Sequence, residues 1–84
     1  MKNKKKLINQ IIYRSLHRGT KEMDILLGSF VKKHVNNFEE EDLEKINELL
    51  NIDDEVLYKF YFHKKNHRSI ENNKVTKLFK KFKL

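Results

Sequence analysis

Residues 13–30 read Tyr-Arg-Ser-Leu-His-Arg-Gly-Thr-Lys-Glu-Met-Asp-Ile-Leu-Leu-Gly-Ser-Phe, and this stretch shows the pattern that the rest of the chain follows. Its apolar residues recur at intervals of three and four on both sides of a short polar break, which is typical of two amphipathic helices. The break contains Gly19, which suits the left-handed conformation that ends many helices, and Thr20, which can cap the next helix. Glu22 and Asp24 follow in the first turn, where carboxylates stabilise the helix dipole. The stretch therefore predicts a helix, a tight corner and a second helix.

The same spacing continues along the chain and predicts an all-α fold, a small compact bundle of about five short helices. The polar residues 63–69 interrupt the spacing and predict a loop. Gly28, inside the second helix, costs about 1 kcal/mol relative to alanine, so we expect a close backbone contact at this position. The expected helices are 7–16, 21–35, 43–50, a short one that Asp53 caps and that carries Leu57, Phe60 and Tyr61 inward, and a last one from about Ile70 to Phe82.

The composition describes a single domain, 1–84, with a basic N-terminal tail over about 1–5. A chain of 84 residues has no room for a second core, and Leu, Ile, Val and Phe supply 27 of them, enough to form one. It contains no cysteine, which excludes disulfides, cysteine-ligated zinc and thiol catalysis. No apolar run approaches the ~18–20 residues that cross a bilayer. We therefore expect a small soluble protein without a membrane span, and a monomer.

The charge of +7 is divided unevenly along the chain. Lysines gather at both ends, whereas 39–55 holds nine of the twelve acids and one lysine. The acidic flank would repel DNA, so we expect no nucleic-acid partner. The alternative is a small basic helical module that binds nucleic acid or an anionic membrane surface through its lysine-rich ends. The last helix itself is open to three interpretations: a packed helix of the bundle, a partner-binding arm, or a membrane-surface helix.

The histidines do not form a convincing catalytic or metal site. His63 and His67 have the four-residue spacing of two metal ligands, but the surrounding residues are basic and would repel a cation. His34 falls on an apolar stripe and is expected at the edge of the core, and His17 stands beside Arg18. The chain also contains no phosphate-binding loop, nucleophile elbow or dinucleotide fingerprint. We expect no catalytic residue, no metal and no enzyme activity.

The corner between the first two helices carries more polar chemistry than a turn requires. Arg14 and Arg18 approach Glu22 and Asp24 there, around a glycine. An ion pair between Arg18 and Glu22 would contribute only a few tenths of a kcal/mol, because the base precedes the acid. Glycine lets another backbone come close, and the arginine fork can bind a carboxylate or a carbonyl. These features predict a recognition surface.

The same residues resemble a known family, the SdhE-type flavinylation factors, also called succinate dehydrogenase assembly factor 2 proteins. The similarity rests on Arg18-Gly19-x-x-Glu22, continues with Met23-Asp24, Leu26-Leu27-Gly28 and Phe30, and extends to Leu49-Leu50 and Asp53-Asp54. It covers roughly 12–61. Two positions depart from the family pattern: Glu55 replaces a proline, and Phe60 replaces a tryptophan and so lacks an indole donor.

The resemblance implies a five-helix assembly chaperone that binds the flavoprotein subunit of succinate dehydrogenase, with the related fumarate reductase subunit as a second client. It implies that the protein promotes covalent attachment of FAD to the client and is not an enzyme. We expect no bound cofactor, since the sequence shows no site for FAD. The client-binding residues it implies are Arg18, Gly19 and Glu22, to which we add their neighbours Arg14 and Asp24, and Phe60.

The location expected from the sequence is the bacterial cytoplasm. No transit peptide precedes the domain, the chain begins with Met1, and its usage is rich in Lys, Asn and Ile but poor in Gly and Pro, which is typical of an AT-rich genome. The alternative is a mature mitochondrial form, over which Met1 and the AT-biased usage favour the bacterium.

Overall fold

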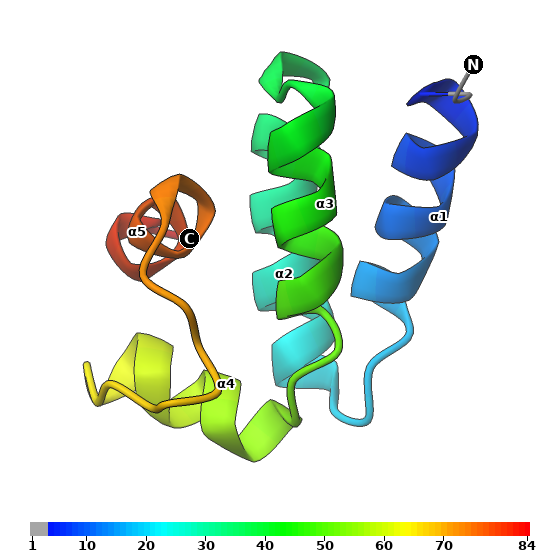
Figure 1. Ribbon diagram of the computed structural model, residues 1–84. Coiled ribbons are helices and arrows are strands. Elements are labelled where there is room, and N and C mark those ends of the chain that lie inside the picture. The colour runs from blue at the N-terminus through cyan, green and yellow to red at the C-terminus, as the bar shows by residue number, and fades with distance from the viewer. Residues whose placement is uncertain (1–3) are drawn as a thin grey trace.

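The chain folds into helices throughout, as the computed structural model of residues 4–84 shows, and no strand occurs in that part of the chain. This confirms the expected all-α bundle. In Figure 1, α1, α2 and α3 run alongside one another, α4 extends from the lower end of α3 to the side away from α1, and α5 is seen end-on above α4. The elements are α1 (Lys4–Leu16), α2 (Lys21–His34), the 3-10 turn η1 (Val35–Asn37), α3 (Glu40–Leu49), α4 (Asp54–Phe62) and α5 (Lys74–Lys81).

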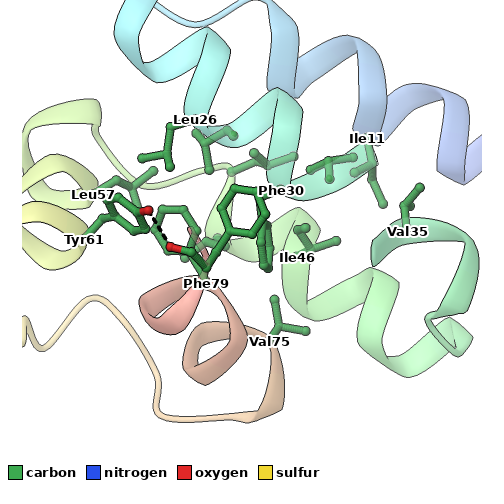
Figure 2. Close-up of a cluster of buried hydrophobic side chains, with 14 of the residues drawn as sticks. Ile11, Leu26, Phe30, Val35, Ile46, Leu57, Tyr61, Val75 and Phe79 are labelled. Atoms are coloured by element: carbon green, nitrogen blue, oxygen red, sulfur yellow. Dashed lines mark hydrogen bonds between the residues drawn. The ribbon is translucent and has the colours of Figure 1, made fainter. Parts of the chain in front are cut away.

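The apolar stripes of the helices meet in one core, with Phe30 of α2 near its centre (Figure 2). The ring of Phe30 meets the rings of Phe79 and Phe82 edge to face, with centroids 5.3 and 5.4 Å apart. Tyr61 donates its hydroxyl hydrogen to the carbonyl oxygen of Phe82, which joins α4 to the end of α5. Each large apolar side chain that is fully buried contributes about 1.5–3 kcal/mol, so these contacts position α4 and α5.

Gly28 lies where α1 and α2 pack together. A methyl group in place of its hydrogen would stand 2.5 Å from Cδ2 of Leu16, closer than carbon atoms approach. The close contact expected at the backbone of Gly28 is therefore present, and the neighbour is the side chain of Leu16 in α1.

The cap predicted at Thr20 is confirmed, whereas Asp53 stands at the N-cap position of α4 without a side-chain capping hydrogen bond, and the start of α5 also differs from the prediction. Thr20 caps α2 by accepting a hydrogen bond from the amide of Met23 at 3.2 Å. α5 begins at Lys74, four residues later than expected, because Asn73 and Thr76 form a capping box and their side chains each accept a bond from the other's amide. Ile70 still packs against the core from the preceding loop.

The segment 1–5, expected to be an N-terminal tail, overlaps the first helix. α1 begins at Lys4, so residues 4 and 5 are helical, while residues 1–3, including Lys2, lie outside the described part of the chain. Within 4–84 there is no helix with the length and apolar character needed to cross a membrane.

His34 lies at the edge of the core, as expected, at the end of α2. Its ring stacks on Phe38 with centroids 5.9 Å apart and lies 5.0 Å from that of Phe30. Burial, with the positive charge of Lys33 as a second cause, lowers the pKa of His34 below its usual 6.5.

Candidate functional site

The α1–α2 corner and the α3–α4 connection lie together at one end of the three long helices (Figure 1). Arg18 joins them. Its Nε donates to Oδ1 of Asp54 at 2.8 Å, and its two terminal nitrogens donate to the carbonyl oxygens of Leu50 and Ile52, the latter at 2.7 Å. Only 12% of the Arg18 side chain is exposed. The guanidinium therefore donates to hydrogen-bond acceptors at the end of α3 and the start of α4, so its own donors are used within the protein.

Gly19 has a different reason to be glycine from the one expected. It does not adopt a positive φ, so the left-handed conformation predicted for it was wrong. Its N–H donates to Oδ2 of Asp54 at 3.1 Å, and a Cβ at this position would stand 3.3 Å from the same oxygen. The absence of a side chain lets the carboxylate reach the backbone, and Gly19 remains exposed.

The two acids of the α2 first turn take separate roles. Asp24 is half-buried, and its Oδ1 accepts a hydrogen bond from the backbone N–H of Arg18 at 2.5 Å. Glu22 is exposed, and within residues 4–84 its side chain makes no hydrogen bond or ion pair. The ion pair between Arg18 and Glu22 considered from the sequence is not formed, because Arg18 turns toward Asp54.

Arg14 also turns inward. Its terminal nitrogens donate to the side-chain oxygens of Asn47 and Asn51, which tie α1 to α3 and to the residues after it. Beside Arg14, Tyr13 is 62% exposed and stacks on His17 with centroids 4.0 Å apart. Arg14 thus shares the corner with Arg18 but does not approach Glu22.

Phe60 is part of the core and lies away from the corner. It is 5% exposed and stacks on Phe79 with centroids 6.1 Å apart, while Nζ of Lys80 lies 5.3 Å from its ring centre. At this position an aromatic ring supports the packing of α4 against α5. Little of Phe60 is left to meet another protein.

A shallow groove runs between the start of α2 and one face of α4, next to the corner. It encloses about 310 Å³ and has a mainly apolar lining, to which Glu22, Tyr58 and His63 contribute. Tyr58 is 37% exposed and Phe62 is 44% exposed, with ring centroids 4.6 Å apart. The sequence indicated neither this groove nor the contacts of Asp54. The spacing of Asp54, Tyr58 and Phe62 at intervals of four could have indicated that they share a face of α4.

His63 and His67, whose spacing is that of two metal ligands, do not form part of a metal centre in the described residues. His63 follows α4 and His67 lies in the next loop, both exposed. Across residues 4–84 no three His, Cys, Asp or Glu side chains are placed to hold one ion. What the corner does provide is an uncharged backbone surface at Gly19, a carboxylate at Glu22 and an apolar groove beside them.

Known proteins similar to this chain come from a plant and from yeasts. It is 36% identical over 58 residues to succinate dehydrogenase assembly factor 2, mitochondrial, of Arabidopsis thaliana, which covers 69% of this chain and 31% of that protein. It is 40% identical over 58 residues to the protein of that name in Scheffersomyces stipitis, covering 69% and 38% of the two chains. The Saccharomyces cerevisiae protein is 38% identical over 60 residues, covering 71% and 36%.

These names overturn the expected location. The relatives from Arabidopsis thaliana, Scheffersomyces stipitis and Saccharomyces cerevisiae are named mitochondrial, which points away from the bacterial cytoplasm expected from the composition. A composition shaped by an AT-rich genome does not separate a bacterium from an organelle. The chain spans 31% to 38% of the length of these relatives.

No solved structure matches the chain. A family described as "Flavinator of succinate dehydrogenase" matches residues 9–83, nearly the whole of it. That range contains all five helices apart from the first residues of α1, as well as the corner and the groove. The chain belongs to the family of succinate dehydrogenase flavinators.

Proposed function

We propose that the protein binds the flavoprotein subunit of succinate dehydrogenase and promotes the covalent attachment of FAD to it. The observation that carries this proposal is the exposed surface of Gly19 and Glu22 at a corner that internal hydrogen bonds hold, in a chain of the flavinator family. The flavoprotein subunit of fumarate reductase is proposed as a second client, because of the resemblance stated above.

The proposed surface is smaller than the set of residues expected from the sequence. Gly19 brings the backbone to the client, and Glu22 supplies a carboxylate that binds a donor or cation on it. Asp24 and Arg14 support this surface through internal hydrogen bonds. Asp24 accepts from the backbone N–H of Arg18, and Arg14 donates to a side chain of α3. Phe60 contributes through the core.

We propose that FAD is held by the client. A second hollow, between the α1–α2 corner and the α3–α4 connection, is lined by Arg18, Asp53, Asp54 and the residues between α3 and α4, and its two carboxylates repel a pyrophosphate. The positive charge in this lining, on Arg18, is already paired with Asp54. This part of the surface does not fit the cofactor.

The proposed contribution to flavinylation is positional. Attachment would join a histidine of the client to the flavin that the client holds, so these two groups would have to be kept in an attack geometry. A bound protein that selects one arrangement of a mobile client accelerates such a step by proximity and preorganisation. This role requires no catalytic residue from the chain, and we propose that it is not an enzyme.

The test is covalent flavin on the co-produced client subunit, measured as protein-bound fluorescence after denaturing electrophoresis in a host without its own factor. The wild-type chain is expected to raise the signal, and Glu22→Ala to reduce that gain about tenfold or more, as expected for a charged partner lost from an interface. Glu41→Ala is the matched control, because Glu41 is likewise exposed and is the second residue of its helix.

The control should retain the wild-type signal. No rise with the wild-type chain and a matched client would refute the proposed function. A wild-type signal with Glu22→Ala would leave the function but remove Glu22 from the surface that carries it.

A further inference from the structure

The corner is held by two carboxylates that reach it from different helices. Asp24 of α2 accepts the backbone N–H of Arg18, and Asp54 of α4 accepts both the Arg18 side chain and the N–H of Gly19. Arg18 and Asp54 are 12% and 24% exposed. This arrangement occupies the guanidinium inside the protein and leaves Gly19 and Glu22 on the outside.

The two carboxylate oxygens of Asp54 accept hydrogen bonds from different residues. Oδ1 lies 2.8 Å from both Nε and Nη2 of Arg18, and Oδ2 lies 3.1 Å from the nitrogen of Gly19. All the partners are donors, so the position requires a group that accepts on both sides. An amide of the same shape would turn a donor toward one of these partners. Charge also matters, because hydrogen bonds between ionised groups are about twice as strong as neutral ones.

We infer that Asp54 is a positioning residue for client binding, and that it acts through Arg18 and Gly19. By closing the corner it sets the direction in which α2 begins, and with it the place of Glu22, the second residue of that helix. The motif arginine then serves as an internal clamp and makes no contact with the client. This inference rests on the proposed function, since client binding gives the corner its purpose.

The neighbouring residue supplies a matched control. Asp53 is exposed, carries the same charge, and makes no side-chain hydrogen bond at the start of α4. Asp53→Asn and Asp54→Asn therefore remove the same charge one residue apart. Only the second places an amide NH2 group opposite a donor, either on Arg18 or on Gly19.

The first measurement is hydrogen exchange at the Gly19 amide by NMR, which needs no client. In Asp54→Asn this amide is expected to exchange about tenfold faster than in the wild type, because it then faces either an NH2 group or an uncharged and weaker acceptor, and Asp53→Asn should leave the rate unchanged. Unchanged exchange in Asp54→Asn would overturn the inference.

The second measurement is client flavinylation, together with the affinity for the client. Asp54→Asn is expected to lose about tenfold in both while its urea unfolding remains cooperative, and Asp53→Asn is expected to match the wild type. If the loss only follows the unfolded fraction of the variant, Asp54 is structural and the inference fails.

Asp54→Glu covers the case in which the asparagine variant does not fold. The longer side chain keeps the charge for Arg18 but moves the carboxylate away from the position that meets Gly19, so we expect a folded chain with reduced flavinylation. Full activity of Asp54→Glu would overturn the inference. A wild-type chain with no flavinylation at all would refute the proposed function and the positioning role together, whereas an active wild type with an equally active Asp54→Asn refutes the positioning role only.

Discussion

The absence of a side chain at Gly19 is favoured by the neighbouring carboxylate of Asp54 and not by the backbone angles of Gly19 itself. Its φ is not positive, so an L-amino acid could adopt the same conformation. The constraint comes from Oδ2 of Asp54, which would lie 3.3 Å from an added Cβ. A carboxylate at the end of a side chain can shift by a few tenths of an ångström, whereas a backbone atom could not do so as easily. A methyl group is therefore tolerated better at position 19 than at a position where glycine adopts a positive φ.

Gly19→Ala is expected to change the free energy of unfolding by less than about 1 kcal/mol, because the smaller freedom of the unfolded chain offsets the shift of Asp54. Gly19→Leu should stay folded but lose flavinylation, since its side chain would cover the proposed contact with the client. Urea denaturation and in-gel flavin fluorescence check the two parts. A Gly19→Leu chain that unfolds would show that the glycine serves only the turn.

At the scale of the helices, the end of α2 and the end of α5 are joined through a titratable residue. His34 closes α2 and packs among the rings of Phe30, Phe38 and Phe82. Phe82 directly follows α5, and Nζ of Lys33 lies 5.7 Å from the centre of its ring. A proton on His34 would put a second positive charge beside Lys33 in this partly apolar site. The packing of α5 therefore favours the neutral imidazole.

Acidification is expected to lower the free energy of unfolding through His34. Because the folded state has the lower pKa, the stability is fully present above the unfolded value of 6.5 and is lost as the pH falls from there through the folded pKa. The slope stays below the one-proton limit of about 1.4 kcal/mol per pH unit. Urea unfolding at about pH 7.5 and about pH 5.5 measures it.

His34→Gln should flatten this dependence, and His67→Gln, which changes an exposed loop histidine, should not. The same loss of stability on acidification in wild type and His34→Gln would assign the effect to other groups.

Over the whole molecule, some of the lysines near the C-terminus and the acids of the middle segment form ion pairs with oppositely charged residues of the same chain. Lys74 pairs with Asp42 at 3.3 Å and Lys45 with Glu71 at 3.2 Å, both joining α3 to the C-terminal segment. The apolar face of α5 is buried, with Val75 and Phe79 fully inaccessible to solvent. Of the interpretations of this helix, the packed helix of the bundle is confirmed, and its apolar face is not free to enter a membrane. Exposed lysines remain on its other face.

The triple variant Lys77→Gln, Lys81→Gln, Lys83→Gln is expected to keep flavinylation within about twofold, as surface changes away from a site do. All three lysines are exposed, and none makes an ion pair with another residue in the described 4–84. Binding of duplex DNA or anionic vesicles, titrated at two salt concentrations, checks the alternative function. Tight, salt-sensitive binding that the triple variant loses, with no flavinylation by the wild-type chain, would favour the basic module.

Local pattern was enough to predict the helices. The three-and-four spacing of apolar residues and the cap at Thr20 are local features, each set by residues a few positions apart, so α1 to α4 were predicted to within a few residues. The start of α5 was misplaced because Ile70 is apolar but packs on the core from a loop. The motif residues were also visible in the sequence, since their spacing resembles that of a known family.

Tertiary structure alone decided what those residues contact. Arg18 and Asp54 are 36 positions apart, and no periodicity relates a corner to the start of a helix two elements later. The sequence therefore determined that a charged corner with a glycine exists. The packing of α3 and α4 decided that its arginine points inward, that Glu22 points outward, and that Phe60 is buried, because hydrogen bonds and burial depend on distances that only the folded chain sets.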